Sequence, residues 1–499
     1  MQIADFAAPD KTIPADWQVS AHATPVAHPK LLAFNHGLAT RLGLQTADCT
    51  PQQLAEIFSG NVVPTGASPM ALAYAGHQFG NFVPQLGDGR ALLLGEVIDP
   101  AGARHDIQLK GSGATPFSRR GDGRAALGPV LREYLVSEAM HALGIPATRA
   151  LAAVATGELV QRERPLPGAV LTRVASSHIR VGTFQYFAAR EDLAALRALA
   201  DHVIARHYPE LSAEPNPYLM LLDAIAERQV RLIAQWMQAG FIHGVMNTDN
   251  MAVSGETLDF GPCAFMEAYH PDTVFSAIDT QGRYAFGQQP VMAAWNLARL
   301  AETLLPLIDG TVEQAASQAQ ALIHTVQPRC RAHYLQGMAA RLGLQELQES
   351  DAPLIDQLLK HLADAGADYT RSLRGLSLMV PAGPAEAQQI ARDNGLPAEA
   401  ALALQDVLQD WLPAWHARLA VQGRPPTAVA QFMNTHNPLY IPRNHLVEQA
   451  LQAAYQGDLE PFRQLQQVLA QPCMAQAGRE AYASAARPEE QVLRTFCGT

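Results

Sequence analysis

The residues best suited to chemistry lie in two short segments near the middle of the chain. Residues 243–250 read His-Gly-Val-Met-Asn-Thr-Asp-Asn, and residues 259–261 read Asp-Phe-Gly. Asn250 offers an amide oxygen and Asp259 a carboxylate. Hard oxygen ligands of this kind suit Mg²⁺ when a nucleotide supplies the remaining oxygens. We therefore expect Asn250 and Asp259 to bind a divalent metal beside a phosphate.

Lys110 and Glu133 add a second part to such a site. Lys110 ends a stretch that predicts a strand, and Glu133 lies in the helix predicted next. A strand lysine paired with a helix glutamate, followed by a His…Asn loop and Asp-Phe-Gly, is the protein-kinase arrangement for holding phosphates. Taken singly, a lysine at a strand end is usually solvated and Asp-Phe-Gly is a weak signal. Their combination is much more specific.

The catalytic segment departs from the kinase pattern at its most important position. The aspartate that acts as the base in kinases would fall at residue 245, which is Val245. A side chain without a proton acceptor cannot be a base. Asp249 is the only acid in the loop, so either Asp249 has taken over or the chain is a silent kinase relative. The glycine loop also departs, because Gly95 follows Gly87 and Gly89 too late for G-x-G-x-x-G.

Glycines and arginines gather upstream of these segments. The tetrapeptide Gly-Asp-Gly-Arg occurs at residues 87–90 and again at 121–124. Glycines let backbone N–H groups approach a phosphate, and an arginine can neutralise it, although Gly-Asp-Gly is also a common tight turn. Ordinary kinases do not need this many arginines, which are Arg90, Arg119, Arg120, Arg124, Arg173 and Arg180.

Periodicity and turn signals predict the elements that position these residues. We expect a hairpin from strands at 91–98 and 106–110, a loop at 111–128, and helices at 31–44, 129–143 and 218–239, with a small hairpin at 251–259. The second half, from about Thr311, is rich in Ala, Leu and Gln and predicts helices. A first half with both strand and helix signals and a helical second half indicate the α+β class.

Composition narrows the possible partners. The chain has 499 residues, 48% hydrophobic, with a net charge of −11, so a broad basic surface for nucleic acid or membrane is not expected. No apolar run reaches the roughly 18 residues of a membrane helix. Residues 1–11 carry no targeting pattern. Five widely spaced cysteines form no metal pair or disulfide framework, which favours the reducing cytoplasm.

Longer motifs resemble one family. The chain is similar to the selenoprotein O family of kinase-like protein adenylyltransferases, known in bacteria as the YdiU family. The matching segments are 75–80, 85–90, 109–113, 117–123, 132–134, 243–251, 258–262, 437–438 and 442–445. They cover nearly the whole chain, and the longer ones are highly specific.

The resemblance implies a fold and an activity. The fold would be a protein-kinase-like bilobal fold with an N-lobe β-sheet, a helical C-lobe and a helical C-terminal extension. Its parts would be an N-terminal extension (1–60), the N-lobe (61–182), the C-lobe (183–325) and the extension (326–499). ATP would bind in a flipped orientation, and AMP would pass to a Ser, Thr or Tyr hydroxyl of a protein, with release of pyrophosphate.

The same resemblance implies roles for individual residues. Lys110, Arg173 and Arg180 would hold phosphates, and Glu133 would orient Lys110. Asn250 and Asp259 would bind Mg²⁺ or Mn²⁺, with Asp259 also at the nucleotide, and Asp249 would be the base. The nucleotide site would be completed by Gly87, Gly89, Arg90, Asp122 and Gly123.

Two alternatives and one terminal residue stay open. A conventional phosphotransferase is disfavoured by Val245 and by the excess of arginines. A non-catalytic ATP-binding scaffold is favoured by the missing acid but not by the complete set of metal and phosphate ligands. Many members of the resembled family carry selenocysteine where Cys497 stands, which suggests a redox role, although an inert thiol fits equally well.

Overall fold

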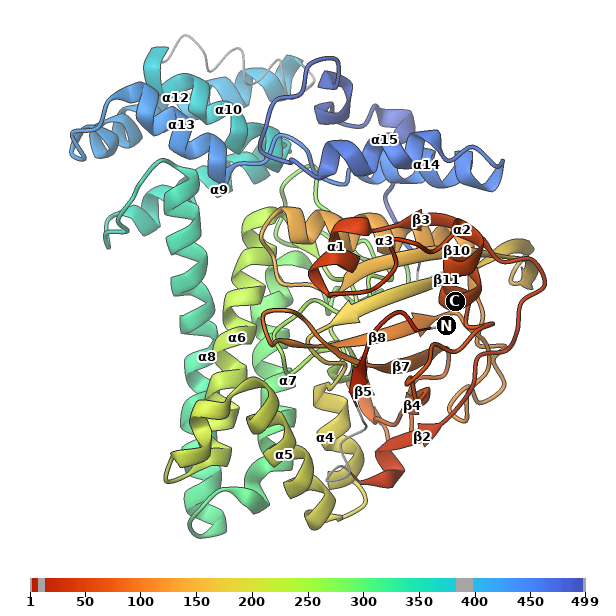
Figure 1. The fold of residues 1–499 in the computed structure, drawn as a ribbon. Helices are drawn as coiled ribbons and strands as arrows, with labels where there is room; N and C mark the ends of the chain where they lie inside the picture. Colours follow the sequence, from red (N-terminus) through yellow and green to blue (C-terminus); the bar gives the residue numbers. More distant parts are fainter. Residues whose placement is uncertain (1, 8–13, 383–397, 497–499) are drawn as a thin grey trace.

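The computed structural model describes residues 2–7, 14–382 and 398–496 and combines one large sheet with many helices (Figure 1). The sheet has nine strands in the order β2-β4-β7-β8-β11-β10-β3, with β1 paired to β7 and β9 to β11. All of these pairs are antiparallel. The predicted α+β class is confirmed.

The strands are mostly short. Their bounds are β1 Phe6–Ala7, β2 Gln18–Ser20, β3 Lys30–Phe34, β4 Met70–Leu72, β5 Gly76–Gln78, β6 Asn81–Val83, β7 Ala91–Ile98, β8 Arg104–Lys110, β9 Ala125–Ala126, β10 Arg149–Gln161, β11 Pro165–Ala175, β12 Phe241–Ile242 and β13 Ala264–Phe265. β5 pairs with β6 and β12 with β13, outside the large sheet.

The helices make up most of the second half. Their bounds are α1 His36–Arg41, α2 Pro51–Ser59, α3 Leu127–Ala142, α4 Val181–Ala188, α5 Leu193–His207, α6 Pro217–Ala239, α7 Gln289–Leu304, α8 Val312–Arg341, α9 Asp351–Asp364, α10 Tyr369–Ala382, α12 Ala398–Ala420, α13 Pro426–His436, α14 Asn444–Tyr455 and α15 Glu460–Leu469. The side chain of Thr311 caps α8, where the sequence predicts the helical half to begin.

Strand β8 carries the polar side chains around which the site is built. Asp106, Gln108 and Lys110 alternate along β8, so they lie on one face of it. All three are buried. A buried row of polar groups needs partners, and the neighbouring elements supply them.

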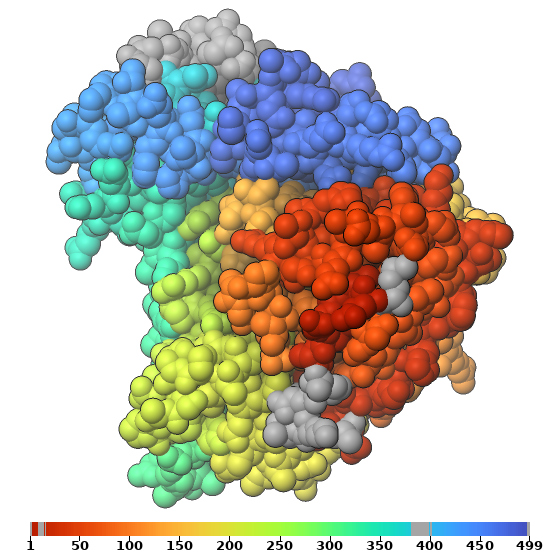
Figure 2. Space-filling model, in the orientation of Figure 1, coloured from red at the N-terminus to blue at the C-terminus, as the bar shows by residue number. Residues whose placement is uncertain are grey.

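Helix α3 lies between the sheet and the C-terminal helices. One apolar cluster joins Leu131 and Tyr134 of α3 to Leu171 of β11 and to Val447 and Phe462 of α14 and α15. Figure 2 shows the C-terminal segment, in blue, forming one end of this face, above the red residues of the sheet. The position of α3 is therefore set from two sides.

The expected elements are confirmed in most places. β7 and β8 form the predicted hairpin, with Ala91 opposite Lys110. α3 begins two residues before Pro129. α6 ends at Gly240, whose φ of 72° lies in the left-handed region that glycine tolerates.

One expectation is wrong, and a second holds only in part. Residues 31–44 do not form one helix, because β3 uses Lys30–Phe34 to pair with β10 and only His36–Arg41 is helical. The hairpin expected at 251–259 is reduced to one antiparallel bridge between its arms, from Met251 to Thr257, while Ala252 bridges to Arg180 and Thr257 to Ala147. The amides of Val253 and Thr257 donate instead to Ile179 and Pro146, so neighbouring segments take the hydrogen bonds that a hairpin would use.

The four-part division stays a prediction. Strands β1, β2 and β3, from the first 60 residues, pair within the large sheet. Within the described residues, no helix is both long and apolar enough to cross a membrane. Cys497 lies outside the described residues.

Candidate active site

Lys110 lies at the centre of a buried ion-pair cluster. Its Nζ is 2.7 Å from Glu133 Oε2 and 2.8 Å from Asp259 Oδ1. β8 brings the lysine and α3 the glutamate, while Asp259 follows the segment after α6. The structure therefore brings together the lysine, glutamate and aspartate that the sequence spacing predicts.

Two arginines complete this cluster. Arg173 of β11 pairs with both Glu133, at 3.3 Å, and Asp259, and Arg180 Nη1 lies 3.2 Å from Asp259 Oδ2. Burial alone would raise the pKa of Asp259, but Arg173, Lys110 and Arg180 together hold it well below the usual carboxyl value. Three cations thus converge on one ionised carboxylate, whose φ of 62° is rare for a residue with a side chain.

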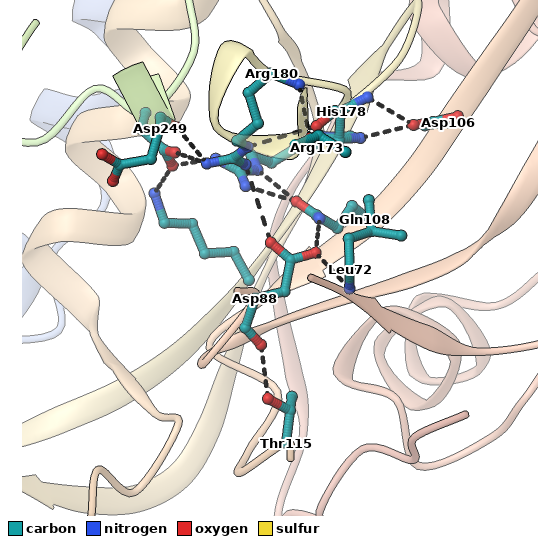
Figure 3. A network of polar contacts seen from close by, with 12 residues as sticks. Leu72, Asp88, Asp106, Gln108, Thr115, Arg173, His178, Arg180 and Asp249 are labelled. Carbon is teal, nitrogen blue, oxygen red and sulfur yellow. Dashed lines mark hydrogen bonds and ion pairs between the residues drawn. The ribbon is translucent and has the colours of Figure 1, made fainter. Parts of the chain in front are cut away.

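A second layer of polar groups fixes Arg173, as Figure 3 shows. Gln108 lies opposite Arg173 in the register of β8 and β11, and its Oε1 accepts from Arg173 Nε at 3.0 Å. Gln108 Nε2 donates to Asp88 Oδ2 at 2.9 Å. Asp88 is in turn 3.9 Å from Arg180. Gln108 thus connects the Gly-Asp-Gly-Arg segment at 87–90 to the arginines.

Arg180 ties the segment at 243–250 to the cluster. Its Nη1 donates to the backbone carbonyl of Asp249 at 2.7 Å, and its guanidinium lies 4.4 Å from the centre of the Tyr74 ring. The amide of the next residue, Val181, donates to the carbonyl of Met251. These contacts hold residues 249–251 against the start of α4.

Asp249 has the environment of a group that can exchange a proton. It is 7% exposed; Gln78 donates to its Oδ2 at 3.1 Å, and Oδ1 has no hydrogen-bond partner among the described residues. Burial raises the pKa of Asp249 to about 6, with Gln78 and Arg180 opposing the rise. A Cβ atom on Gly76 would lie 2.6 Å from Oδ1, so glycine is needed there for the carboxylate to keep its place.

His243 supports the loop from behind. Its ring is fully buried, stacks on Trp236 at 5.3 Å, and has Nε2 2.9 Å from the carbonyl of Leu258. Burial lowers its pKa, which keeps the ring neutral. His243 therefore positions the segment that leads to Asp259.

The residues present fit a divalent metal. Asn250 Nδ2 donates to the carbonyl of Val245 at 3.0 Å, which leaves the amide oxygen as the atom able to bind a cation. Asn250 and Asp259 both line the same cavity. Among the described residues, no three or more His, Cys, Asp or Glu side chains gather as a metal site. A pair of protein oxygens is what Mg²⁺ takes when phosphates complete its shell.

Two cavities meet at this site. The first, of about 680 Å³, is lined by Lys110, Glu133, Arg173, Arg180, Asn250 and Asp259 among others. The second, of about 710 Å³, is lined by Gly87, Phe117, Asp122 and Gly123 among others. Both are lined by Tyr74, Gln78, Gly89, Arg90 and Asp249.

The second cavity gathers the glycine-rich residues that the sequence singles out. Gly87 has φ 116°, and a Cβ there would lie 2.4 Å from the ring of Phe117. Gly123 has φ 66°, and a Cβ there would lie 2.0 Å from the carbonyl oxygen of Gly113. These glycines let both Gly-Asp-Gly-Arg segments pack closely against residues 113–117.

Not every predicted residue joins the central cluster. Asp122 binds Arg162, at 2.8 Å, and its side chain is 45% exposed. Arg124 donates to the carbonyls of Thr24 and Pro25, while Arg119 and Arg120 line the second cavity. Motif matching passed over Tyr74, Gln78, Asp88 and Gln108 as separate contributors. The sequence held one signal, and it concerned Gln108 alone: polar residues alternate along β8 at 106, 108 and 110.

Comparison with known proteins agrees with this geometry. The sequence model of the family described as "Protein adenylyltransferase SelO" matches residues 6–470. The chain belongs to this family. It is an enzyme, a nucleotidyltransferase that uses ATP. The expected family resemblance is thereby confirmed.

Bacterial relatives of the SelO family match along nearly the whole chain, and the three below are each named "Protein nucleotidyltransferase YdiU". One, from Cereibacter sphaeroides, is 56% identical over 97% of this chain and 96% of its own length. Another, from Rhizobium johnstonii, is 55% identical over 98% and 96%. A third, from Rhizobium meliloti, is 54% identical over 98% of each.

Proposed function

We propose that this enzyme transfers AMP from ATP to Ser, Thr or Tyr hydroxyls of proteins and releases pyrophosphate. The observation that carries the proposal is the place of Asp249, which lines both cavities where they meet. A nucleotide with its phosphates among Lys110, Arg173 and Arg180 and its nucleoside in the glycine-rich cavity would have its α-phosphate at this junction. A base at the junction suits attack on the α-phosphate, whereas attack on the γ-phosphate needs a base at the far end.

The orientation of ATP follows from the same argument. In this proposal Gly87, Gly89, Arg90, Asp122 and Gly123 surround the nucleoside, so the nucleotide is flipped relative to its position in a kinase. The fold is then a bilobal kinase-like one, with an N-terminal extension at 1–60, the N-lobe at 61–182, the C-lobe at 183–325 and the helical extension at 326–499. Glu133 keeps Lys110 directed at the phosphates.

The transfer step is a substitution at the α-phosphorus. The acceptor oxygen forms a bond to this atom, and the bond to the oxygen that bridges the α- and β-phosphates breaks. The hydroxyl proton passes to Asp249, and the leaving electron pair stays on pyrophosphate. Lys110, Arg173 and Arg180 stabilise the charge that builds up on the leaving group.

Asn250 and Asp259 would hold Mg²⁺ or Mn²⁺ in this site. Such an ion, when bound, neutralises phosphate charge and helps to orient the nucleotide. Asp259 would then exchange part of its contact with the three cations for the metal, while the phosphates take up those cations. This exchange explains why an unusually large number of positive charges surrounds one carboxylate.

Labelled ATP tests the proposal. The full chain, with Mg²⁺ or Mn²⁺ and dephosphorylated casein as acceptor, is incubated with ATP labelled on either the α- or the γ-phosphate. AMP transfer leaves label on protein only from the α-position. Retention from the γ-position alone would establish a phosphotransferase, and ATP binding without retention from either would establish a scaffold.

A further inference from the structure

The start of helix α3 forms a part of the first cavity that the proposed chemistry does not use. Gly128, Pro129 and Val130 of its first turn line this cavity, together with Arg132. α3 is 16 residues long, and its N-cap, Ala126, forms no side-chain cap hydrogen bond. The amides of a helix start carry partial positive charge and attract anions. Pro129 has no N–H group, and the amide of Gly128 donates to the hydroxyl of Tyr455, so the first turn gives this cavity the positive end of the helix dipole and not a set of free N–H donors.

Arg132 supplies an independent sign of a missing ligand. Its side chain is 7% exposed, and its Nε and Nη1 form no hydrogen bond with any described residue. Within the described residues, Nη2 alone has a hydrogen-bond acceptor, the carbonyl of Cys263. Buried guanidinium nitrogens are expensive to leave unbonded, and two adjacent ones suit a bidentate oxyanion.

Glu448 of α14 partly compensates this charge. Its Oε1 is 3.5 Å from Arg132 Nη1, too far for a good hydrogen bond. The Glu448 side chain is 40% exposed, so it can turn toward solvent. A carboxylate in this position competes with any anion that enters.

We propose that Arg132, at the positive end of the α3 dipole, binds inorganic pyrophosphate as it leaves the phosphate cluster. The inference rests on the proposed function for the source of this anion, since AMP transfer releases pyrophosphate into the same cavity. Arg132 is one residue before Glu133, which pairs with Lys110, so the subsite and the cluster share one helix. Arg132 is a binding residue in this scheme and touches no reacting atom.

Equilibrium titration with pyrophosphate tests the subsite without any transfer reaction. The full chain is titrated with pyrophosphate, orthophosphate and ATP by calorimetry, without metal. Arg132→Gln should weaken pyrophosphate binding by roughly ten-fold or more, since it removes charge-assisted hydrogen bonds. Glu448→Gln should strengthen the same binding several-fold, because it removes the competing carboxylate. Arg231→Gln, at an arginine 65% exposed on α6, is the matched control and should leave binding unchanged.

The opposite signs separate a binding role from a structural one. If Arg132 only connects α3 to α14, both variants should leave pyrophosphate affinity unchanged, and that result would overturn the proposal. Equal losses for pyrophosphate and ATP in Arg132→Gln would place the end of ATP itself here and reject an exit site. Should Arg132→Gln fail to fold, Glu448→Gln and the rescue variant Arg132→Lys still decide the question.

The subsite and the proposed function can fail separately. Loss of label transfer with an intact pyrophosphate response would reject AMP transfer but keep the anion site. Label transfer with no response to either substitution would reject the subsite alone. In the active enzyme, the subsite predicts that inhibition by added pyrophosphate weakens in Arg132→Gln.

Discussion

The Asp259 cluster and the Arg443 cluster are both buried networks of arginine and carboxylate, but only the first lines a described cavity. Arg443 is fully buried, with Nη1 2.7 Å from Asp368 and 3.3 Å from Glu267. Two of its nitrogens, like two of Arg132's, form no hydrogen bond with a described residue. Within the described part of the chain, neither Arg443 nor Asp368 lines the two cavities at the site.

This difference teaches that buried charge alone does not mark a site. The Arg443 cluster joins the segment after Asp-Phe-Gly to α10 and to the start of α14, so its work is to hold the C-terminal helices in place. The Asp259 cluster holds cations beside open space, where a nucleotide can enter. We therefore assign the motifs at 437–438 and 442–445 to the scaffold, and we propose that Lys110, Arg173 and Asp259 serve the chemistry.

Substituting the aspartate of each cluster should give the largest contrast. Asp259→Asn should reduce AMP transfer by roughly 10³-fold, because the carboxylate that orders the cations and would bind metal is lost. Asp368→Asn should lower the free energy of unfolding by about 3 kcal/mol, because Arg443 keeps a buried charge without its partner. Label transfer and denaturant unfolding, measured on both variants, check this. Equal loss of activity in both would remove the distinction between the clusters.

The two clusters should also differ in their response to pH. In the scaffold, burial would raise the pKa of Glu267, but His445 and Arg443 bring it below the usual value, so this group stays ionised. Burial raises the pKa of Asp249 to about 6. Because a base must be deprotonated, AMP transfer should rise as the pH passes through about 6 and level off above it.

A profile of kcat/KM from about pH 5 to about pH 8 measures this rising limb, in which the rate increases with pH. Asp249→Asn should lower the rate by roughly 10²-fold or more and abolish the limb. A profile that keeps its limb in Asp249→Asn would assign the titration to another group.

A smaller effect is expected where backbone shape positions Asp249. Gly76→Ala should reduce kcat by roughly 10- to 100-fold, since the new methyl group pushes against the carboxylate. Gly37→Ala, in α1, is the matched control, because its Cβ would meet nothing closer than 3.7 Å. Unchanged kcat in Gly76→Ala would show that the position of Asp249 is not critical.

The smallest effect should come from the amides that hold the arginines. Gln108 accepts from Arg173, and Asn437 accepts from Arg341 Nε at 2.8 Å in the scaffold. Gln108→Leu should raise the KM for ATP by roughly ten-fold, in line with the loss of one buried hydrogen-bonding group. Asn437→Leu should leave this KM unchanged and lower the unfolding midpoint. Steady-state kinetics and thermal unfolding of the pair distinguish the two roles.

The central part of the site was predictable from the sequence because a strand lysine, a helix glutamate and an Asp-Phe-Gly segment follow one another in the order that protein kinases use. Lys110, Glu133 and Asp259 lie together as their spacing predicts. Gln108 was signalled only by the row of polar residues in β8. Its burial was not predictable, because a glutamine in an alternating strand usually faces water, and only the packing of the folded chain shows that it is buried. The proposed binding role of Arg132 could not be predicted for a similar reason. Its two nitrogens without hydrogen bonds are a property of the packed structure, which the sequence does not reveal.

The fold was predictable where local signals dominate. Gly240 and Gly144 end helices as glycines do, and the hairpin of β7 and β8 follows its turn residues. The helix expected at 31–44 was wrong because its apolar residues suit a strand edge as well as a helix face, and β10 offered the partner. Long-range pairing of this kind cannot be read from one short segment.

The intact mass of the acceptor protein tests the central claim most directly. After incubation of the full chain with ATP, divalent metal and dephosphorylated casein, mass spectrometry compares casein before and after the reaction. The account predicts an increase by one or more AMP groups, lost in Asp259→Asn and kept in Arg231→Gln. An increase by phosphoryl groups alone would contradict it, because the attacked phosphorus would then lie at the end of ATP and not at the junction where Asp249 stands.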